Sequence, residues 1–145
     1  MTPVGDPGRG DPIELRPVGQ VESPLVDPAD APRQGDEGAP EAWLVFDPAV
    51  RAAAADLAVG EDVVVLTWLD RGDRSALVVH PRGDLDRPPQ GVFSTRSPDR
   101  PNPIGLHRAR VVAVDGLRVR VDGLEAVDGT PILDVKPVLG ALDER

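Results

Sequence analysis

The sequence has no cysteine and no tyrosine, and its 145 residues hold only two histidines, two tryptophans and two phenylalanines. Without cysteine, neither a disulfide nor a thiolate metal site is available, so we expect no metal. The two histidines, His80 and His107, stand far apart and are each expected to be a core or surface histidine. No run approaches the ~20 apolar residues of a membrane helix, and the start MTPVGDPGRGDP lacks the features of a secretion signal. We therefore expect a cytoplasmic protein with no membrane partner.

Several common catalytic motifs are also absent. The chain contains no G-x-S-x-G, no phosphate-binding loop, and no G-x-G-x-x-G after a strand. The usual Rossmann route to nucleotide cofactors is thereby excluded.

The charge is acidic but unevenly distributed. A net charge of −9 argues against general affinity for nucleic acid, which depends on neutralising phosphates. Residues 91–110 nevertheless hold Arg96, Arg100, Arg108 and Arg110 against the single carboxylate of Asp99. This distribution predicts a local cationic face that suits one specific anionic partner.

The chain divides into one domain and two short tails. Residues 1–12 are rich in glycine, proline and charge and are expected to form a disordered tail, and residues 141–145 are expected to form a second tail. The domain is expected to span 13–140. Its first segment, 13–22, alternates imperfectly and contains Pro17, which predicts an edge strand. Residues 23–41 hold four prolines and predict a long loop.

The remaining pattern predicts a mainly β protein. Asp47 as N-cap and Pro48 at the first helical position predict a helix that ends near Gly60. Apolar or alternating runs predict strands at 43–46, 63–69, 76–79, 91–95, 106–114, 117–121 and 131–135. The pair Asp115-Gly116 is typical of a hairpin turn. Short strands joined by turns predict a single-sheeted antiparallel β-barrel with one or two short helices.

The segment STRSPDRPNPIG, residues 94–105, concentrates the unusual chemistry. Its three prolines restrict the backbone before any ligand arrives, and such preorganisation lowers the entropy lost on binding. Arg96 and Arg100 can grip a carboxylate or phosphate, and the amide of Asn102 can donate and accept at once. The structural alternative is a proline-rich corner whose arginines pair with acidic neighbours.

Two further segments carry polar groups. Lys136 is the only lysine, and in a strand it lies on the same face as Asp134, either as a surface ion pair or as part of a substrate site. Asp128-Gly129 is either an ordinary turn or a binding loop. A third candidate is 32–35, PRQG, inside the long loop.

These segments together resemble a known family. GVFSTRSPDRPNPIGL at 91–106 resembles the signature G-V-F-A-T-R-S-P-x-R-P-N-P-I-G-L of the TsaA-like, or TrmO-like, methyltransferases. The segments 123–137 and 32–34 resemble that family's second and N-terminal signatures, and the resemblance spans about 13–138.

The resemblance implies a homodimeric β-barrel that binds S-adenosylmethionine without a Rossmann fold. It implies methylation of N6 in the threonylcarbamoyl-modified adenosine beside the anticodon of tRNA. The cofactor-binding residues that it implies are Gln34, Gly35, Asp36, Leu69, Asp70, Ser94, Thr95, Arg96, Ile104, Leu106, Leu124, Asp128, Gly129 and Thr130.

The roles in catalysis are hypotheses built on the resemblance. A proton must leave the acceptor nitrogen, and Asp134 or Asp128 is the expected acceptor of that proton. The residues expected to hold the substrate are Arg33, Arg100, Asn102 and Lys136. Two other functions stay open at this point. One is methylation of a small metabolite, and the other is non-catalytic binding of RNA or a nucleotide, which the few aromatic side chains disfavour.

Overall fold

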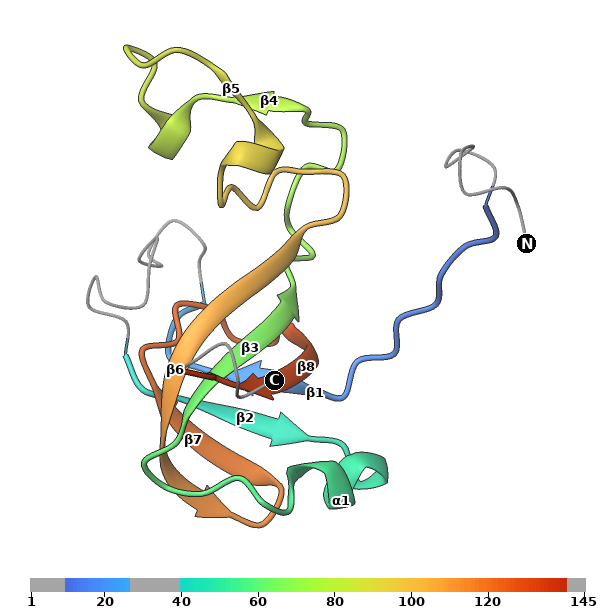
Figure 1. The fold of residues 1–145 in the computed structure, drawn as a ribbon, viewed down its shortest axis with the longest axis vertical. Helices are drawn as coiled ribbons and strands as arrows, with labels where there is room; N and C mark the ends of the chain where they lie inside the picture. The colour runs from blue at the N-terminus through green and yellow to red at the C-terminus, as the bar shows by residue number, and fades with distance from the viewer. Residues whose placement is uncertain (1–9, 27–39, 141–145) are drawn as a thin grey trace.

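The protein folds as a closed antiparallel β-barrel, which confirms the predicted fold class (Figure 1). The computed structural model describes residues 10–26 and 40–140. Six strands close the barrel in the order β1-β2-β7-β6-β3-β8. Their bounds are β1 Gly19–Glu22, β2 Ala42–Phe46, β3 Asp62–Trp68, β6 Ile104–Asp115, β7 Arg118–Asp122 and β8 Pro131–Pro137. Every neighbouring pair in this ring is antiparallel.

The alternating sequence of the strands determines which side chains fill the barrel. In β3 the buried positions are Val63, Val65 and Thr67, and the residues between them face outward. β6 alternates in the same way from Gly105 to Val111. Because successive side chains of a strand point to opposite faces, these residues join those of the other strands in one core. Its largest fully buried members include Leu44, Leu124 and Ile132.

The predicted hairpin is present, with its turn shifted by one residue. Asp115 pairs with Arg118, so the two-residue loop is Gly116-Leu117 and not Asp115-Gly116. Gly116 has φ +61°, a left-handed conformation that glycine adopts without steric cost.

Two predicted elements at the start of the chain are shorter than expected. The first strand begins at Gly19 and not at residue 13, and the prediction of an edge was wrong because β1 pairs with both β2 and β8. Asp47 does accept a hydrogen bond from the amide of Ala49 as an N-cap, and Pro48 begins the 3-10 helix η4, Pro48–Val50. The following helix α1, Arg51–Ala54, ends well before Gly60. Only Ala54 of its four residues is buried, so no apolar stripe is present to stabilise further turns.

The chain between β3 and β6 forms an insertion that differs most from the prediction. It contains the two-stranded sheet of β4 (Val78–Val79) and β5 (Gln90–Gly91) and the 3-10 helices η5 (Pro81–Gly83) and η6 (Val92–Ser94). The strand predicted at 76–79 is only two residues long, and most of the strand predicted at 91–95 is replaced by η6. Val78 is exposed, although it was predicted to be buried. The insertion projects beyond one end of the barrel, and α1 lies at the opposite end (Figure 1).

No helix in the described ranges is long and apolar enough to span a membrane. Among the same residues, no three histidine or acidic side chains are grouped to hold a metal ion.

Candidate functional site

The proline-rich segment keeps its shape through the side chain of Arg100. The guanidinium donates hydrogen bonds to the carbonyls of Thr95 (2.9 Å), Ser97 (3.0 Å) and Val92 (2.8 Å). Three bonds from one planar donor group fix the path of the chain from η6 to the prolines. The structure thus uses Arg100 to hold the loop, and a substrate-binding role for it rests on the resemblance alone.

The turn that follows β3 packs directly against this segment. Arg74 donates to the carbonyl of Pro101 (2.8 Å) and to Oδ1 of Asn102 (3.0 Å). Its guanidinium also lies 5.1 Å from the ring centroid of Trp68, at the end of β3. A second link joins the amide of Asp73 to the carboxylate of Asp99 at 2.9 Å. The candidate residues of the turn and of the proline-rich segment are therefore held side by side.

The backbone of this contact leaves no room for a side chain at Gly72. A Cβ there would lie 3.0 Å from the carbonyl carbon of Pro98 and in hard contact with its oxygen. The amide of Leu69 donates to the carbonyl of Pro103 at 2.7 Å. The two candidate segments therefore meet by direct backbone contact as well as through Arg74.

The third candidate segment, 124–130, is attached to the start of the chain. The amides of Asp128 and Gly129 donate to the carbonyls of Leu25 (2.6 Å) and Val21 (2.7 Å). Oδ1 of Asp128 accepts from the amide of Ser23 at 3.0 Å. The hydroxyl of Thr130 is buried and donates to the carbonyl of Val127. Leu124 is also fully buried, so only its backbone can face a ligand.

A buried polar chain connects this third segment to the barrel wall. Oγ1 of Thr67 lies 2.7 Å from Nε2 of His107, and Nδ1 of His107 lies 2.6 Å from Oε1 of Glu125. Thr67 and His107 are 0% and 5% exposed, so of the two alternatives left open by the sequence, core or surface, His107 is a core histidine. Each of the three residues stands one or two positions from a candidate cofactor residue: Leu69, Leu106 or Leu124.

Asp134 and Lys136 lie on the outer face of β8, as their spacing predicted. Lys136 Nζ is 3.6 Å from Asp134 Oδ2, and both side chains are more than half exposed. Across the sheet, Asp134 pairs with Leu66, which pairs with Leu106, so the three side chains form one cross-strand row. The same pair also borders a pocket of about 250 Å³ between β8 and α1, whose apolar lining includes Val50 and Leu57.

Several candidate residues have polar groups that are free to meet a ligand. Arg96 and Asp70 are exposed, and neither side chain has a partner in the part of the chain that the structure describes. Ser94 is also exposed, whereas the hydroxyl of Thr95 donates to the carbonyl of Val92. Ile104, which pairs with Trp68 at the end of β3, and Leu106 carry exposed apolar side chains at the start of β6.

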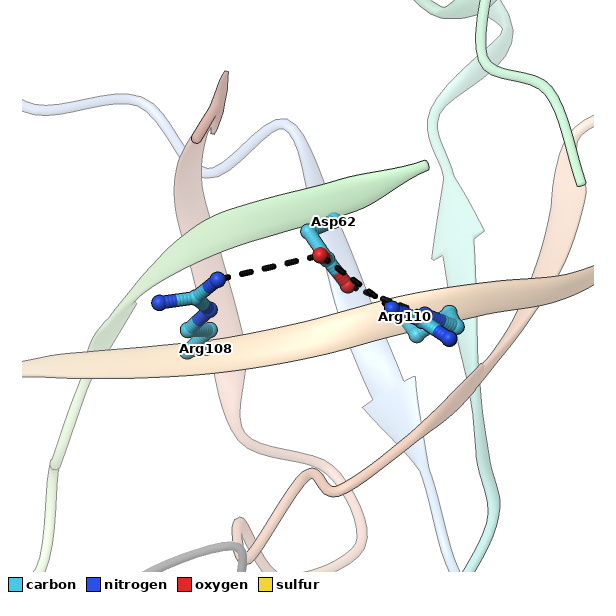
Figure 2. A network of polar contacts seen from close by, with 3 residues as sticks. All are labelled: Asp62, Arg108 and Arg110. Atoms are coloured by element: carbon cyan, nitrogen blue, oxygen red, sulfur yellow. Dashed lines mark hydrogen bonds and ion pairs between the residues drawn. The ribbon is translucent and has the colours of Figure 1, made fainter. Parts of the chain in front are cut away.

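The cationic face predicted for 91–110 is largely neutralised. Arg110 Nε lies 3.0 Å from Asp62 Oδ1, and Arg108 reaches the same carboxylate at 3.7 Å (Figure 2). The hydrogen bond from Arg110 is the main reason that the pKa of Asp62 is held below its usual value. Arg100 binds backbone carbonyls, so Arg96 is left as the arginine of this segment without a partner among the described residues.

Four predicted site residues lie outside the described residues: Arg33, Gln34, Gly35 and Asp36. Conversely, sequence reasoning missed Thr67, Arg74 and Glu125. A histidine on the inward-facing side of a strand was a usable signal, because a buried imidazole needs partners. Which residues those were depended on strand register, which the sequence alone did not provide.

Comparison with known proteins gives a consistent result. The family described as tRNA-methyltransferase O N-terminal domain matches residues 20–144. A probable S-adenosyl-L-methionine-binding protein of Methanothermobacter thermautotrophicus is 41% identical over 131 residues, which cover 90% of this chain and 93% of that protein. A protein of Archaeoglobus fulgidus with the same description is 39% identical over 131 residues, but the match covers only 35% of its length.

Solved structures agree with the sequence relatives. The crystal structure of TrmO from Pseudomonas aeruginosa superposes with a TM-score of 0.70 at 26% identity, and covers 93% of this chain and 62% of that one. A second crystal structure of TrmO gives a TM-score of 0.72. The chain thus spans about three fifths of these structures and about a third of the Archaeoglobus fulgidus protein.

Proposed function

Because the chain belongs to the tRNA-methyltransferase O N-terminal domain family, we propose that it is an S-adenosylmethionine-dependent methyltransferase. Its proposed acceptor is N6 of the threonylcarbamoyl-modified adenosine beside the anticodon of tRNA. One observation carries the proposal: the family match extends over 20–144 and so includes both long signature segments, which the contact of His107 with Glu125 joins in the fold. Names of relatives that bind S-adenosylmethionine support the choice of cofactor.

The side chains at these segments fit the chemistry of the cofactor. S-adenosylmethionine has a carboxylate, which suits the unpaired guanidinium of Arg96, and two ribose hydroxyls, which suit the unpaired carboxylate of Asp70. Its adenine is apolar on both faces, and the exposed side chains of Ile104 and Leu106 offer an apolar surface. The residues present therefore fit the group.

The proposed reaction needs alignment more than chemical assistance from the protein. When bound, S-adenosylmethionine supplies a methyl group carried on a sulfonium. In the transfer the carbon–sulfur bond breaks, the new carbon–nitrogen bond forms in line, and the nitrogen loses a proton. We assign the acceptance of that proton to Asp134, with Asp128 as the alternative. Each carboxylate accepts one backbone amide, Asp134 from Val135 and Asp128 from Ser23. Asp134 is the better candidate because it lies in one cross-strand row with Leu66 and the candidate cofactor residue Leu106.

Positioning of the substrate is assigned to two exposed polar side chains, Lys136 on β8 and Asn102 in the insertion. Lys136 neutralises Asp134 at rest and can pair with an anionic group of the substrate instead. The side-chain oxygen of Asn102 accepts a hydrogen bond from Arg74, so its side-chain N–H groups can donate to the substrate. Arg33 stays part of this proposal through the resemblance.

We also propose that the protein is a cytoplasmic homodimer. The support is the exposed apolar surface of the insertion, where Leu77, Val78, Leu85 and Phe93 are each 58–85% exposed. Apolar surface gathered in one part of a molecule is typical of an interface. Sedimentation at micromolar concentration tests this part, and a monomer there would remove it.

The test of the activity is transfer of labelled methyl from S-adenosylmethionine to tRNA with and without the threonylcarbamoyl modification. We expect incorporation only into modified tRNA. Binding of the cofactor without incorporation into either tRNA would reject the proposed acceptor and leave a small-molecule acceptor.

The role of Asp134 is tested separately with Asp134→Asn. We expect cofactor affinity within about twofold of wild type and turnover lower by about 10²–10⁴, the usual contribution of a general base. Unchanged turnover would reject the assignment of Asp134.

A further inference from the structure

Glu125 carries a buried oxygen that nothing in the fold accounts for. Its Oε1 is hydrogen-bonded to Nδ1 of His107, but its Oε2 is inaccessible to solvent and has no hydrogen-bond partner. The side chain as a whole is 13% exposed. Buried polar atoms in native proteins nearly always have a partner, so an exception needs an explanation.

The geometry of the neighbouring residues fixes which way Glu125 is held. Gly105 stands opposite Thr67, and a Cβ at Gly105 would lie 2.5 Å from Thr67 Oγ1 and 2.7 Å from His107 Nε2. Only glycine leaves the space in which Thr67 and His107 meet. The imidazole is thus clamped at Nε2 and presents Nδ1 to Glu125.

Among the hydrogen-bonding atoms of Thr67, His107 and Glu125, one acceptor has no donor. With a neutral imidazole, Nδ1–H donates to the carboxylate and Nε2 accepts the Thr67 hydroxyl, so every donor is used. A charged imidazole would instead leave the hydroxyl proton of Thr67 without an acceptor among the described residues. The neutral form is therefore the better fit, and it leaves Glu125 Oε2 as an acceptor waiting for a donor.

The three residues have the order of a hydroxyl–imidazole–carboxylate catalytic triad, but they do not form one. Thr67 is 0% exposed and points into the core, whereas the Glu125 side chain is 13% exposed, so the carboxylate and not the hydroxyl is the end of the chain nearest the surface. The arrangement instead resembles a support, in which an inner hydrogen-bond chain holds one polar atom in a fixed place.

We propose that Glu125 is a ligand-binding residue, whose Oε2 accepts a hydrogen bond from the bound cofactor, and that Thr67 and His107 are its positioning residues. The inference rests on the proposed function, because it takes S-adenosylmethionine as the ligand. That molecule offers an ammonium, two ribose hydroxyls and an exocyclic amine as donors. Glu125 follows Leu124, the first residue of the candidate segment 124–130, and the net positive charge of the ligand complements the carboxylate.

Calorimetric titration with S-adenosylmethionine tests the inference in the full chain. Glu125→Gln keeps the shape but removes the charge, and Glu125→Ala removes both oxygens. We expect the dissociation constant to rise at least about tenfold in each, the effect of losing a hydrogen bond to a charged group. Glu61→Gln is the matched control, because Glu61 accepts the amide of Ala58 at the α1 end of the barrel. Its affinity is expected to match wild type.

A second readout follows the positioning residues without any ligand. Nitrogen-15 NMR of the free protein is expected to show His107 neutral, with its proton on Nδ1. In Thr67→Val the imidazole loses its clamp, and we expect weaker cofactor binding while Glu125 is still present.

The possible outcomes distinguish failure of the proposed function from failure of the role assigned to Glu125. Wild type that fails to bind the cofactor overturns the proposed function and this inference with it. Wild type that binds, with both folded Glu125 variants within twofold of it, overturns the inference alone and assigns Oε2 to a water molecule. If Glu125→Ala does not fold, the Glu125→Gln titration decides.

Discussion

Replacement of Gly105 by alanine is predicted to destabilise the barrel strongly. The added Cβ would lie 2.5 Å from Thr67 Oγ1 and 2.7 Å from His107 Nε2, atoms that themselves meet at 2.7 Å. Forcing a methyl group into a packed core costs about 1–3 kcal/mol, and leaving buried polar groups unpaired costs about 1–3 kcal/mol more. We therefore expect the free energy of unfolding to fall by about 2–6 kcal/mol, out of a usual total of about 5–15 kcal/mol. For a chain of this length the melting temperature falls by about 4–24 °C.

The assay is chemical unfolding in urea, followed by the fluorescence of the two tryptophans and by circular dichroism. Gly91→Ala is the matched control, because no atom lies within 4 Å of a Cβ built there and its φ is −59°. That variant is expected to be as stable as wild type. Thr67→Ala removes one of the two clashing atoms, so Gly105→Ala should cost at least about 1 kcal/mol less in that background. A Gly105→Ala protein within 0.5 kcal/mol of wild type would show that this buried chain tolerates displacement and would refute the reasoning.

Two further predictions concern Arg100 and the surface carboxylates. Arg100→Lys cannot reach three carbonyls at once, so we expect faster amide exchange and proteolysis at 92–100, with no such change in Arg87→Lys, whose side chain is exposed. The hydrogen bond from Arg118 lowers the pKa of Glu22 from its usual 4.5. Its stabilising effect is therefore complete above pH 4.5 and is lost as the pH falls through the lower folded-state pKa. In urea titrations across the acid range, Glu22→Gln is expected to lose less stability than wild type, and parallel curves would contradict this.

The barrel strands were predictable because burial on one face leaves a period of two in the sequence. β6 shows this alternation from Gly105 to Val111 and β7 shows it from Arg118 to Val121, and Asp115-Gly116 located their turn to within one residue. The insertion carries no such pattern, because its strands are two residues long and most of its large apolar side chains are exposed, Val92 being an exception. Short apolar runs were interpreted there as buried strands, and the interpretation failed for that reason.

The sequence predicted which residue types make up the candidate site, but not which of these side chains contact one another. The residue types of the proline-rich segment indicated a donor-rich corner, and that corner exists. Whether Arg100 contacts a ligand or the nearby backbone could not be predicted, because a guanidinium can donate hydrogen bonds to ligand oxygens and to backbone carbonyls alike. The chain from Thr67 through His107 to Glu125 joins residues 40 and 18 positions apart, and only the register of β3 against β6 brings them together.

The closed ring of six strands has a consequence for how the protein varies. Because every barrel strand has a neighbour on both sides, the core is complete without the insertion. The insertion leaves the barrel at the end of β3 and returns at the start of β6 (Figure 1). No side chain of 70–103 belongs to the buried core cluster of the described residues. Substitutions in the insertion can therefore change the surface at this end of the molecule without removing a side chain from the barrel core.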